Sequence, residues 1–268
     1  MNLRHIFILP ALLAAMACSD DSPVTPDTPD TPEGPDITNS VEKLVSIDAG
    51  QTFQTIAGFG ASDCWSPAFV GKSWTSHRAG ITELLFSSEI VGGKPKGIGL
   101  SQWRVNLGGG SAAQGEACGI EDKSRRAESY LTDDLTYDWT RCEGQRYFMD
   151  RAKELGCNNF VLFSNTPPVQ YTYNGKGFSA RGGLSNLKPE HYGDFAGYMA
   201  DVAARYTGEG YHISHISPVN EPQYNWDSGQ EGSGWTNDEV AALARELDMS
   251  LDARGLSTDI LLGESGDW

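Results

Sequence analysis

Short apolar segments alternate with amphipathic helical segments through most of this 268-residue chain, and that alternation restricts its fold more than any other feature. Strands are predicted at residues 99–107, 159–164, 213–219 and 259–263, with weaker ones at 44–47 and 52–59. Strands that are separated by helices form a parallel sheet with the helices packed outside it. Both a doubly wound open sheet and a barrel satisfy this order.

The segments between the strands carry helix patterns and helix-end signals. Helices are predicted at residues 78–90, 145–155, 189–208 and 236–252. Thr236 and Glu239 have the spacing of a capping box. Pro189 suits a helix start, because the N–H that proline lacks would have no hydrogen-bond partner within the helix there. The polar stretch at residues 111–141 is predicted to be a long inserted loop.

Polar residues follow the predicted strands at the point where each strand ends. No Gly-x-Gly-x-x-Gly follows the first strand, which disfavours a dinucleotide fold. Polar groups on successive strand ends favour the catalytic face of a barrel, because the carboxyl ends of parallel strands meet at one face. The residues concerned are Asp63, Arg104, Asn106, Asn165, Asn220, Glu221 and Glu264.

The strongest single motif is the strand at residues 213–219 with the Asn220-Glu221-Pro222 that follows it. A carboxylate in this position suits a catalytic role, and Asn220 offers donors and an acceptor to a sugar hydroxyl. Pro222 biases Glu221 toward extended backbone angles. The alternative is a strand that ends in an ordinary polar turn.

Charge and composition exclude several function classes. The formal net charge is −16, so a nucleic-acid partner is not expected, since phosphates require a basic surface. The five histidines show no ligand spacing and no Cys-x-x-Cys occurs, so no metal site is predicted. Among the four cysteines after Cys18, we favour a disulfide between Cys118 and Cys142, which flank the polar insertion.

The N-terminal segment has the layout of an export signal. Arg4 and His5 precede an apolar run at residues 6–17 that is too short to span a bilayer. Cys18 follows small residues and resembles the lipidated cysteine of a bacterial lipoprotein, although Ala15 stands where a leucine is usual. We therefore predict a signal peptide at residues 1–18 with lipidation at Cys18; plain secretion is the alternative.

A proline-rich linker at residues 19–40 follows, with a proline at every third position from Pro23 to Pro35. Polyproline II has three residues per turn, so this stretch is predicted to be a stiff stalk or an inert disordered linker. The protein is then expected at the outer membrane or cell surface, held only by its lipid, or else secreted or periplasmic. Residues 41–268 are predicted to be one globular region, and the protein is predicted to be a monomer.

Several motifs, in the same order, resemble glycoside hydrolase family 30. They lie at residues 58–62, 103–106, 164–168 and 217–223, and those at 186–189, 194–196 and 230–232 are similar to its endo-β-1,6-galactanase-like branch. The resemblance covers residues 45–268. It implies a (β/α)8 barrel with a small β-sandwich, of which this chain supplies about five of eight strands, and hydrolysis that retains anomeric configuration.

The resemblance also implies roles for individual residues. Glu221 matches the general acid/base, Asn220 a contact to the sugar hydroxyl beside the cleaved bond, and Arg104 an arginine that supports the nucleophile. Trp65, Asp63 and Asn165 are expected to contact substrate. As alternatives, Arg104 could be an interior ion-pair partner and Trp65 a core residue.

Retaining hydrolysis requires a second carboxylate, and the family's nucleophile is a Glu on the seventh strand. Glu264 matches a family position that contacts substrate or supports the residues that do, and its use as the nucleophile is the less favoured alternative. The chain is therefore expected to be the N-terminal part of a longer enzyme, poorly folded and inactive alone. The substrate is predicted to be β-1,6-galactan, with β-1,6-glucan and glucuronoxylan as alternatives, and no cofactor is implied. A glycan-binding lipoprotein and an inactive fragment remain the other interpretations.

Overall fold

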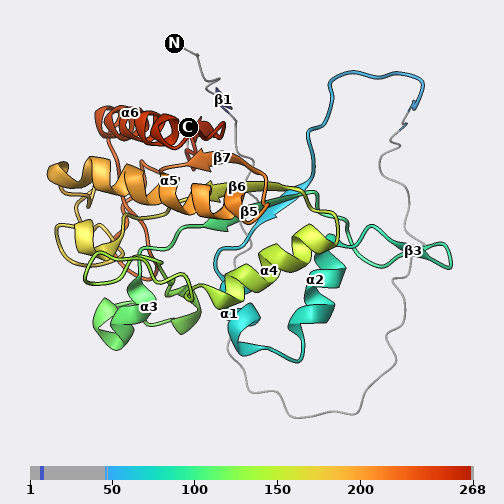
Figure 1. The fold of residues 1–268 in the computed structure, drawn as a ribbon, viewed down its shortest axis with the longest axis horizontal. Helices are drawn as coiled ribbons and strands as arrows, with labels where there is room; N and C mark the ends of the chain where they lie inside the picture. The colour runs from blue at the N-terminus through green and yellow to red at the C-terminus, as the bar shows by residue number, and fades with distance from the viewer. Residues whose placement is uncertain (1–6, 9–45, 47, 267–268) are drawn as a thin grey trace. The chain divides into compact units, whose positions relative to one another are not determined.

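A parallel sheet forms the centre of the computed structural model, which describes residues 7–8, 46 and 48–266 (Figure 1). Its strands are β2 (Gly60–Ser62), β5 (Gln102–Asn106), β6 (Asn159–Phe163), β7 (Ile213–Ser217) and β8 (Asp259–Leu262). They are hydrogen-bonded in the order β8-β7-β6-β5-β2, and the two-residue strand β1 (Phe7–Ile8) lies parallel to β8. The chain divides into two units, Leu13–Ala57 and the remainder, and this sheet belongs to the remainder.

The strand order decides between the two predicted architectures. From β2 to β8, each strand pairs in parallel with the next large strand along the chain. A doubly wound sheet would reverse its order at a switch point, whereas a barrel continues in one direction. The sheet therefore has barrel topology, with five strands in this part of the chain, and the predicted fold class is confirmed.

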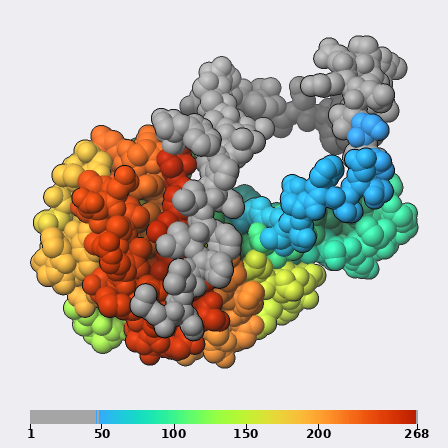
Figure 2. All heavy atoms as spheres, turned by 90° about the horizontal axis from the view of Figure 1, so that it is seen from above, coloured from blue at the N-terminus to red at the C-terminus, as the bar shows by residue number. Residues whose placement is uncertain are grey.

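Helices connect the strands, as the alternating pattern predicts. They are α1 (Ser66–Ser73), α2 (Arg78–Phe86), α4 (Glu143–Glu154), α5 (Tyr192–Gly208) and α6 (Asn237–Ala253). The capping box at Thr236 and Glu239 is present at the start of α6. Figure 2 shows the red atoms of the α6 region at the opposite end of this unit from the teal atoms of the segment near residue 90.

The remaining elements are short. They are the hairpin β3 (Ile90–Val91) and β4 (Lys94–Pro95), the helix α3 (Ser111–Gln114), and the 3-10 turns η1 (Gly115–Cys118), η2 (Lys123–Arg125), η3 (Val169–Tyr171) and η4 (Pro189–His191). Most of the stretch at residues 111–141 is loop, as predicted, but α3, η1 and η2 within it are helical. Local side-chain caps, such as Asp122 accepting from the Ser124 N–H at 2.9 Å, stabilise these turns.

Two other predictions fail on packing grounds. The strand predicted at residues 52–59 is absent. Phe53 and Phe59 are exposed there, so their side chains do not pack in the core, as a buried strand would require. The expected disulfide is absent, since Cys118 and Cys142 are both free thiols. Cys118 Sγ instead accepts a hydrogen bond from the Ile120 N–H, and Cys142 packs in the main core at the start of α4.

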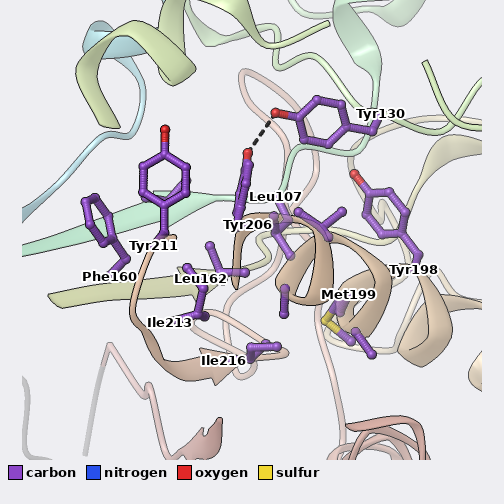
Figure 3. Close-up of a cluster of buried hydrophobic side chains, with 14 of the residues drawn as sticks. Leu107, Tyr130, Phe160, Leu162, Tyr198, Met199, Tyr206, Tyr211, Ile213 and Ile216 are labelled. Atoms are coloured by element: carbon purple, nitrogen blue, oxygen red, sulfur yellow. Dashed lines mark hydrogen bonds between the residues drawn. The ribbon is translucent and has the colours of Figure 1, made fainter. Parts of the chain in front are cut away.

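The core lies between the sheet and helices α4 and α5 (Figure 3). Leu162 of β6 and Ile216 of β7 are fully buried with Met199 and Tyr206 of α5. The Tyr206 hydroxyl shares a 2.7 Å hydrogen bond with that of Tyr130, so the insertion after β5 is tied to α5. This packing fixes the strand ends from which the candidate site is built.

The predicted signal peptide, Cys18, the proline-rich linker and, apart from Ser46, the weak strand at 44–47 lie outside the described residues. Among the residues that are described, no helix is long and apolar enough to cross a membrane.

Candidate active site

The strand-end residues lie where the sequence predicted them. Asp63 follows β2, Asn165 follows β6, and Glu264 follows β8. Asn220 and Glu221 come shortly after β7, while Arg104 and Asn106 lie on β5 itself. Because all five strands run parallel, these residues share one edge of the sheet.

Arg104 is the centre of this group. Its Nη2 donates to Asn220 Oδ1 at 2.7 Å and also to Glu264 Oε2, with which it forms an ion pair. The guanidinium carbon lies 3.3 Å from the centroid of the Phe163 ring. Arg104 on β5 therefore contacts residues at the ends of β6, β7 and β8, and its positive charge lies among an amide, a carboxylate and an aromatic face.

The Glu221 backbone is in the left-handed region, with φ of 43°, and the prediction of extended angles was wrong. The chain turns here because the Glu221 carbonyl accepts from the Tyr224 N–H at 3.0 Å and from Trp226 Nε1 at 3.2 Å. The Glu221 N–H donates to the Glu264 carbonyl at 2.9 Å. A non-glycine residue in this conformation is strained, and such strain concentrates at functional sites.

The side chain of Glu221 packs against glycine. A Cβ placed on Gly266 would lie 2.8 Å from Glu221 Oε1 and 3.1 Å from its Cδ, so any other residue here would make the Glu221 side chain shift. The backbone between Glu264 and Gly266 thus touches Glu221 twice, once through a hydrogen bond and once through this close approach.

Asp63 is buried, with 1% of its surface exposed. Its Oδ1 accepts from the Asn106 N–H at 2.9 Å and its Oδ2 accepts from Gln145 Nε2. Burial raises the pKa of the Asp63 carboxyl to about 6, and the hydrogen bonds and nearby Arg104 only partly oppose that effect. Asp63 therefore connects β2, β5 and α4, and it also lines the cavity beside the strand ends, so its contact with substrate stays a prediction.

Asn165 and Trp65 form a neighbouring group rather than part of the Arg104 group. Asn165 is 4% exposed, and its Nδ2 donates to Cys64 Sγ at 3.4 Å. Its carbonyl accepts from the Ser233 N–H, which ties the loop after β7 to the end of β6. Trp65 is half-buried at the start of α1 and lines a cavity beside the strand ends.

A buried carboxylate that the sequence did not single out as a site residue is Glu231. Its Oε2 accepts from the Gly109 N–H at 2.7 Å and its Oε1 from the Ser111 N–H at 2.9 Å. Burial raises the pKa of Glu231, and these donors oppose the shift. Glu231 thereby holds the glycine-rich turn after β5 against the loop after β7. In the sequence, Glu231 stood out only because it lies in the stretch at residues 230–232, which resembles the family.

The arrangement supplies a positioned carboxyl group, a fixed amide and a cation at one sheet edge, which suits acid–base chemistry on a hydroxyl-rich substrate. Among the described residues, no group of three or more His, Cys, Asp or Glu side chains could hold a metal ion.

Known proteins share sequence and fold with this chain. The chain is 26% identical over 234 residues to an endo-beta-1,6-galactanase of Hypocrea rufa, covering 80% of this chain and 47% of that protein. A conserved exported protein from Bacteroides fragilis has a similar structure, with 37% identity, a TM-score of 0.78, and coverage of 82% of this chain and 46% of that one.

The catalytic domain of the GH30 xylanase C from Talaromyces cellulolyticus shares the fold, with 22% identity, a TM-score of 0.59, and coverage of 82% and 48% of the two chains. The chain thus spans about half the length of the relatives it matches. The family model described as O-Glycosyl hydrolase family 30 matches residues 42–268. Because that match covers most of its length and the strand order is that of a barrel, this chain belongs to glycoside hydrolase family 30.

Proposed function

We propose that the protein is a retaining glycoside hydrolase that cleaves β-1,6-galactan within the polymer, with Glu221 as its general acid/base. The observation that carries this proposal is the placement of Glu221, held by its own backbone turn beside an Asn220 that Arg104 fixes. The galactan assignment follows the Hypocrea rufa relative, whose sequence matches 80% of this chain.

In the proposed reaction, a carboxylate attacks the anomeric carbon while the Glu221 carboxyl gives its proton to the departing glycosidic oxygen. The Glu221 carboxylate then takes a proton from water while that water attacks the anomeric carbon. The glycosyl–enzyme bond breaks, which releases the sugar and frees the nucleophilic carboxylate. Asn220 is assigned to the hydroxyl next to the cleaved bond. Its Oδ1 accepts from Arg104, so its Nδ2 is oriented as the group that donates.

The nucleophile is assigned to a carboxylate from a strand that this half-length chain does not supply. Glu264 is a poorer candidate, because it follows β8, the fifth strand of this parallel series, whereas the nucleophile is expected on the seventh. We assign Glu264 to substrate contact and to holding the Glu221 turn. Asp63 is assigned to supporting the strand ends, and Trp65 and Asn165 to the sugar-binding surface.

Product analysis with the full-length protein tests this proposal. β-1,6-Galactan, β-1,6-glucan and glucuronoxylan are incubated separately, and the anomeric configuration of the first product is followed by proton NMR. Release of β-configured galacto-oligosaccharides from galactan alone is expected. Products from either other polymer would reassign the substrate, and binding without release would favour a glycan-binding protein.

We further propose that the protein is exported and anchored through a lipid on Cys18, and that it is monomeric. A similar structure is that of an exported protein, which supports export. Metabolic labelling with radioactive palmitate tests the anchor, with Cys18→Ser as control. Incorporation into the parent and not the variant is expected, and label-free protein in the culture medium would mean plain secretion. Light scattering of the purified protein tests the monomer.

A further inference from the structure

A cavity of about 290 Å³ lies beside the Arg104 group, on the side of the sheet that β2 borders. Its walls come from three parts of the chain. The strand ends provide Asp63 and Asn106, helix α1 provides Phe69 with Trp65 just before it, and the insertion after β5 provides Ala127 and Glu128. This volume is near the lower end for small-ligand sites, so it suits one sugar ring rather than several.

The cavity borders the candidate active site through backbone contacts. Asn106 lies two residues beyond Arg104 on β5, so the two side chains leave the strand on the same face. The Asp63 N–H donates to the Arg104 carbonyl at 2.9 Å. Glu221 follows β7, which is separated from β5 by β6. The cavity is therefore on the far side of Arg104 from the residue that would protonate the leaving group.

The charges around the cavity are already paired. Lys72 Nζ lies 2.5 Å from Glu128 Oε1, and the two terminal nitrogens of Arg126 contact the Glu116 carboxylate at 3.1 Å. Lys123 Nζ, the third cation of the lining, lies 4.0 Å from the same Glu116 carboxylate. Each lining cation therefore faces a carboxylate, which favours a neutral ligand over a carboxylated or sulfated one.

The lining also offers both kinds of group that hold a sugar. Phe69 is a 38%-exposed aromatic on α1, available to the apolar face of a ring. Asn106 is 6% exposed, and its Oδ1 has no hydrogen-bond partner among the described residues. An unpartnered buried amide oxygen costs free energy unless a hydroxyl or water supplies a proton, so this amide retains binding capacity.

From these observations we infer that the cavity is a subsite for one neutral hexopyranosyl unit on the glycon side of the cleaved bond. This inference rests on the proposed hydrolysis of galactan and assigns a further sugar of that same substrate to α1 and the insertion. Phe69 is its stacking surface. Contacts remote from the reacting bond supply binding energy that an endo-acting enzyme can use to orient its substrate.

Chromogenic β-1,6-galactosides with one, two and three galactosyl units and the same leaving group test the subsite. In the full-length protein, kcat/KM is expected to rise with length, and Phe69→Ala should lower the three-unit to one-unit ratio about tenfold. Ser73→Trp fills the cavity from an exposed position on its rim and should also lower the ratio. Trp74→Ala is the matched control, since Trp74 is an exposed aromatic at the end of α1 that does not line the cavity.

Calorimetric binding of β-1,6-galactotriose to the same variants separates the two proposals. If the parent protein hydrolyses the galactosides, but Phe69→Ala and Ser73→Trp change neither the three-unit to one-unit ratio nor the affinity, the subsite is overturned. The proposed function would then still stand. If the parent protein cleaves no galactoside, the function fails. Weaker binding in Phe69→Ala and Ser73→Trp, but not in Trp74→Ala, would then still establish the subsite, and equal affinity in all forms would overturn it as well.

Discussion

Arg104 and Asn220 are 116 residues apart in the chain, and the Arg104 guanidinium donates a 2.7 Å hydrogen bond to Asn220 Oδ1. The same nitrogen donates to Glu264, so one side chain orders the ends of β5, β7 and β8. The amide and the carboxylate are thereby fixed before any substrate arrives. Such preorganisation is what a catalytic hydrogen-bonding group requires.

Replacing Arg104 with Met should remove both bonds and leave the Glu264 carboxylate unpaired. Because Arg104 and Glu264 are 24% and 18% exposed, solvent screens part of this loss. We expect the free energy of unfolding to fall by about 1–2 kcal/mol, as measured by urea denaturation. The double variant Arg104→Met/Glu264→Gln should recover part of the loss. Strictly additive losses would show that the pair contributes nothing.

Glu221 offers a test of strain at the site. With φ of 43°, Glu221→Gly should be more stable than Glu221→Ala by about 1 kcal/mol, since only glycine adopts this conformation without cost. Both variants lack the carboxyl group, so both should lose hydrolysis of galactan. Paired thermal melts give the comparison, and equal melting temperatures would mean that residue 221 is unstrained in solution.

The same variants test the role of Glu221 as an acid. An aryl galactoside with an activated leaving group needs little protonation, so Glu221→Ala should cleave it far better, relative to the parent, than it cleaves galactan. A loss of similar size on both substrates would point to a role in folding or binding instead.

Asp63 should make stability depend on pH in a defined window. Its pKa is about 6 when folded and near the ordinary 3.8 when unfolded, so the folded state binds this proton more tightly. The free energy of unfolding contributed by Asp63 therefore falls as pH rises from 3.8 to 6, by up to about 3 kcal/mol. Denaturation of the parent and of Asp63→Asn between pH 4 and 7.5 measures the difference. Parallel curves would contradict the raised pKa.

Glu231 should be essential to the loops at the carboxyl edge. In Glu231→Gln, the new NH2 group faces one of the N–H donors of Gly109 and Ser111, and that buried donor loses its partner. We expect a loss of about 1–3 kcal/mol in unfolding free energy, with Glu231→Ala costing more. Glu190→Gln, on the 3-10 turn η4 and exposed, is a control that should have little effect. A neutral Glu231→Gln would mean that the carboxyl is protonated when folded.

Sequence patterns predicted the sheet, its parallel order and the helices because each depends on local periodicity and end signals. The capping box at Thr236 and the strand ending before Asn220 are examples. Patterns failed where particular hydrogen bonds or packing contacts, local as well as distant, decide the outcome. Pro222 suggested an extended Glu221, yet the Tyr224 and Trp226 donors and the Glu264 carbonyl turn the chain there. A disulfide between Cys118 and Cys142 was predicted because they flank the polar insertion. In the structure, Cys118 Sγ accepts from the Ile120 N–H and Cys142 packs in the main core.

The sequence by itself determined which residues stand at the strand ends, because each short apolar run ends in polar residues and the helices between the runs make the strands parallel. The tertiary structure alone decided what those residues touch. It paired Arg104 with Glu264, buried Asp63 against Gln145, and placed Glu231 under the turn at Gly109. Hydrogen bonds and desolvation act over a few ångströms, so they depend on chain segments that only folding brings together.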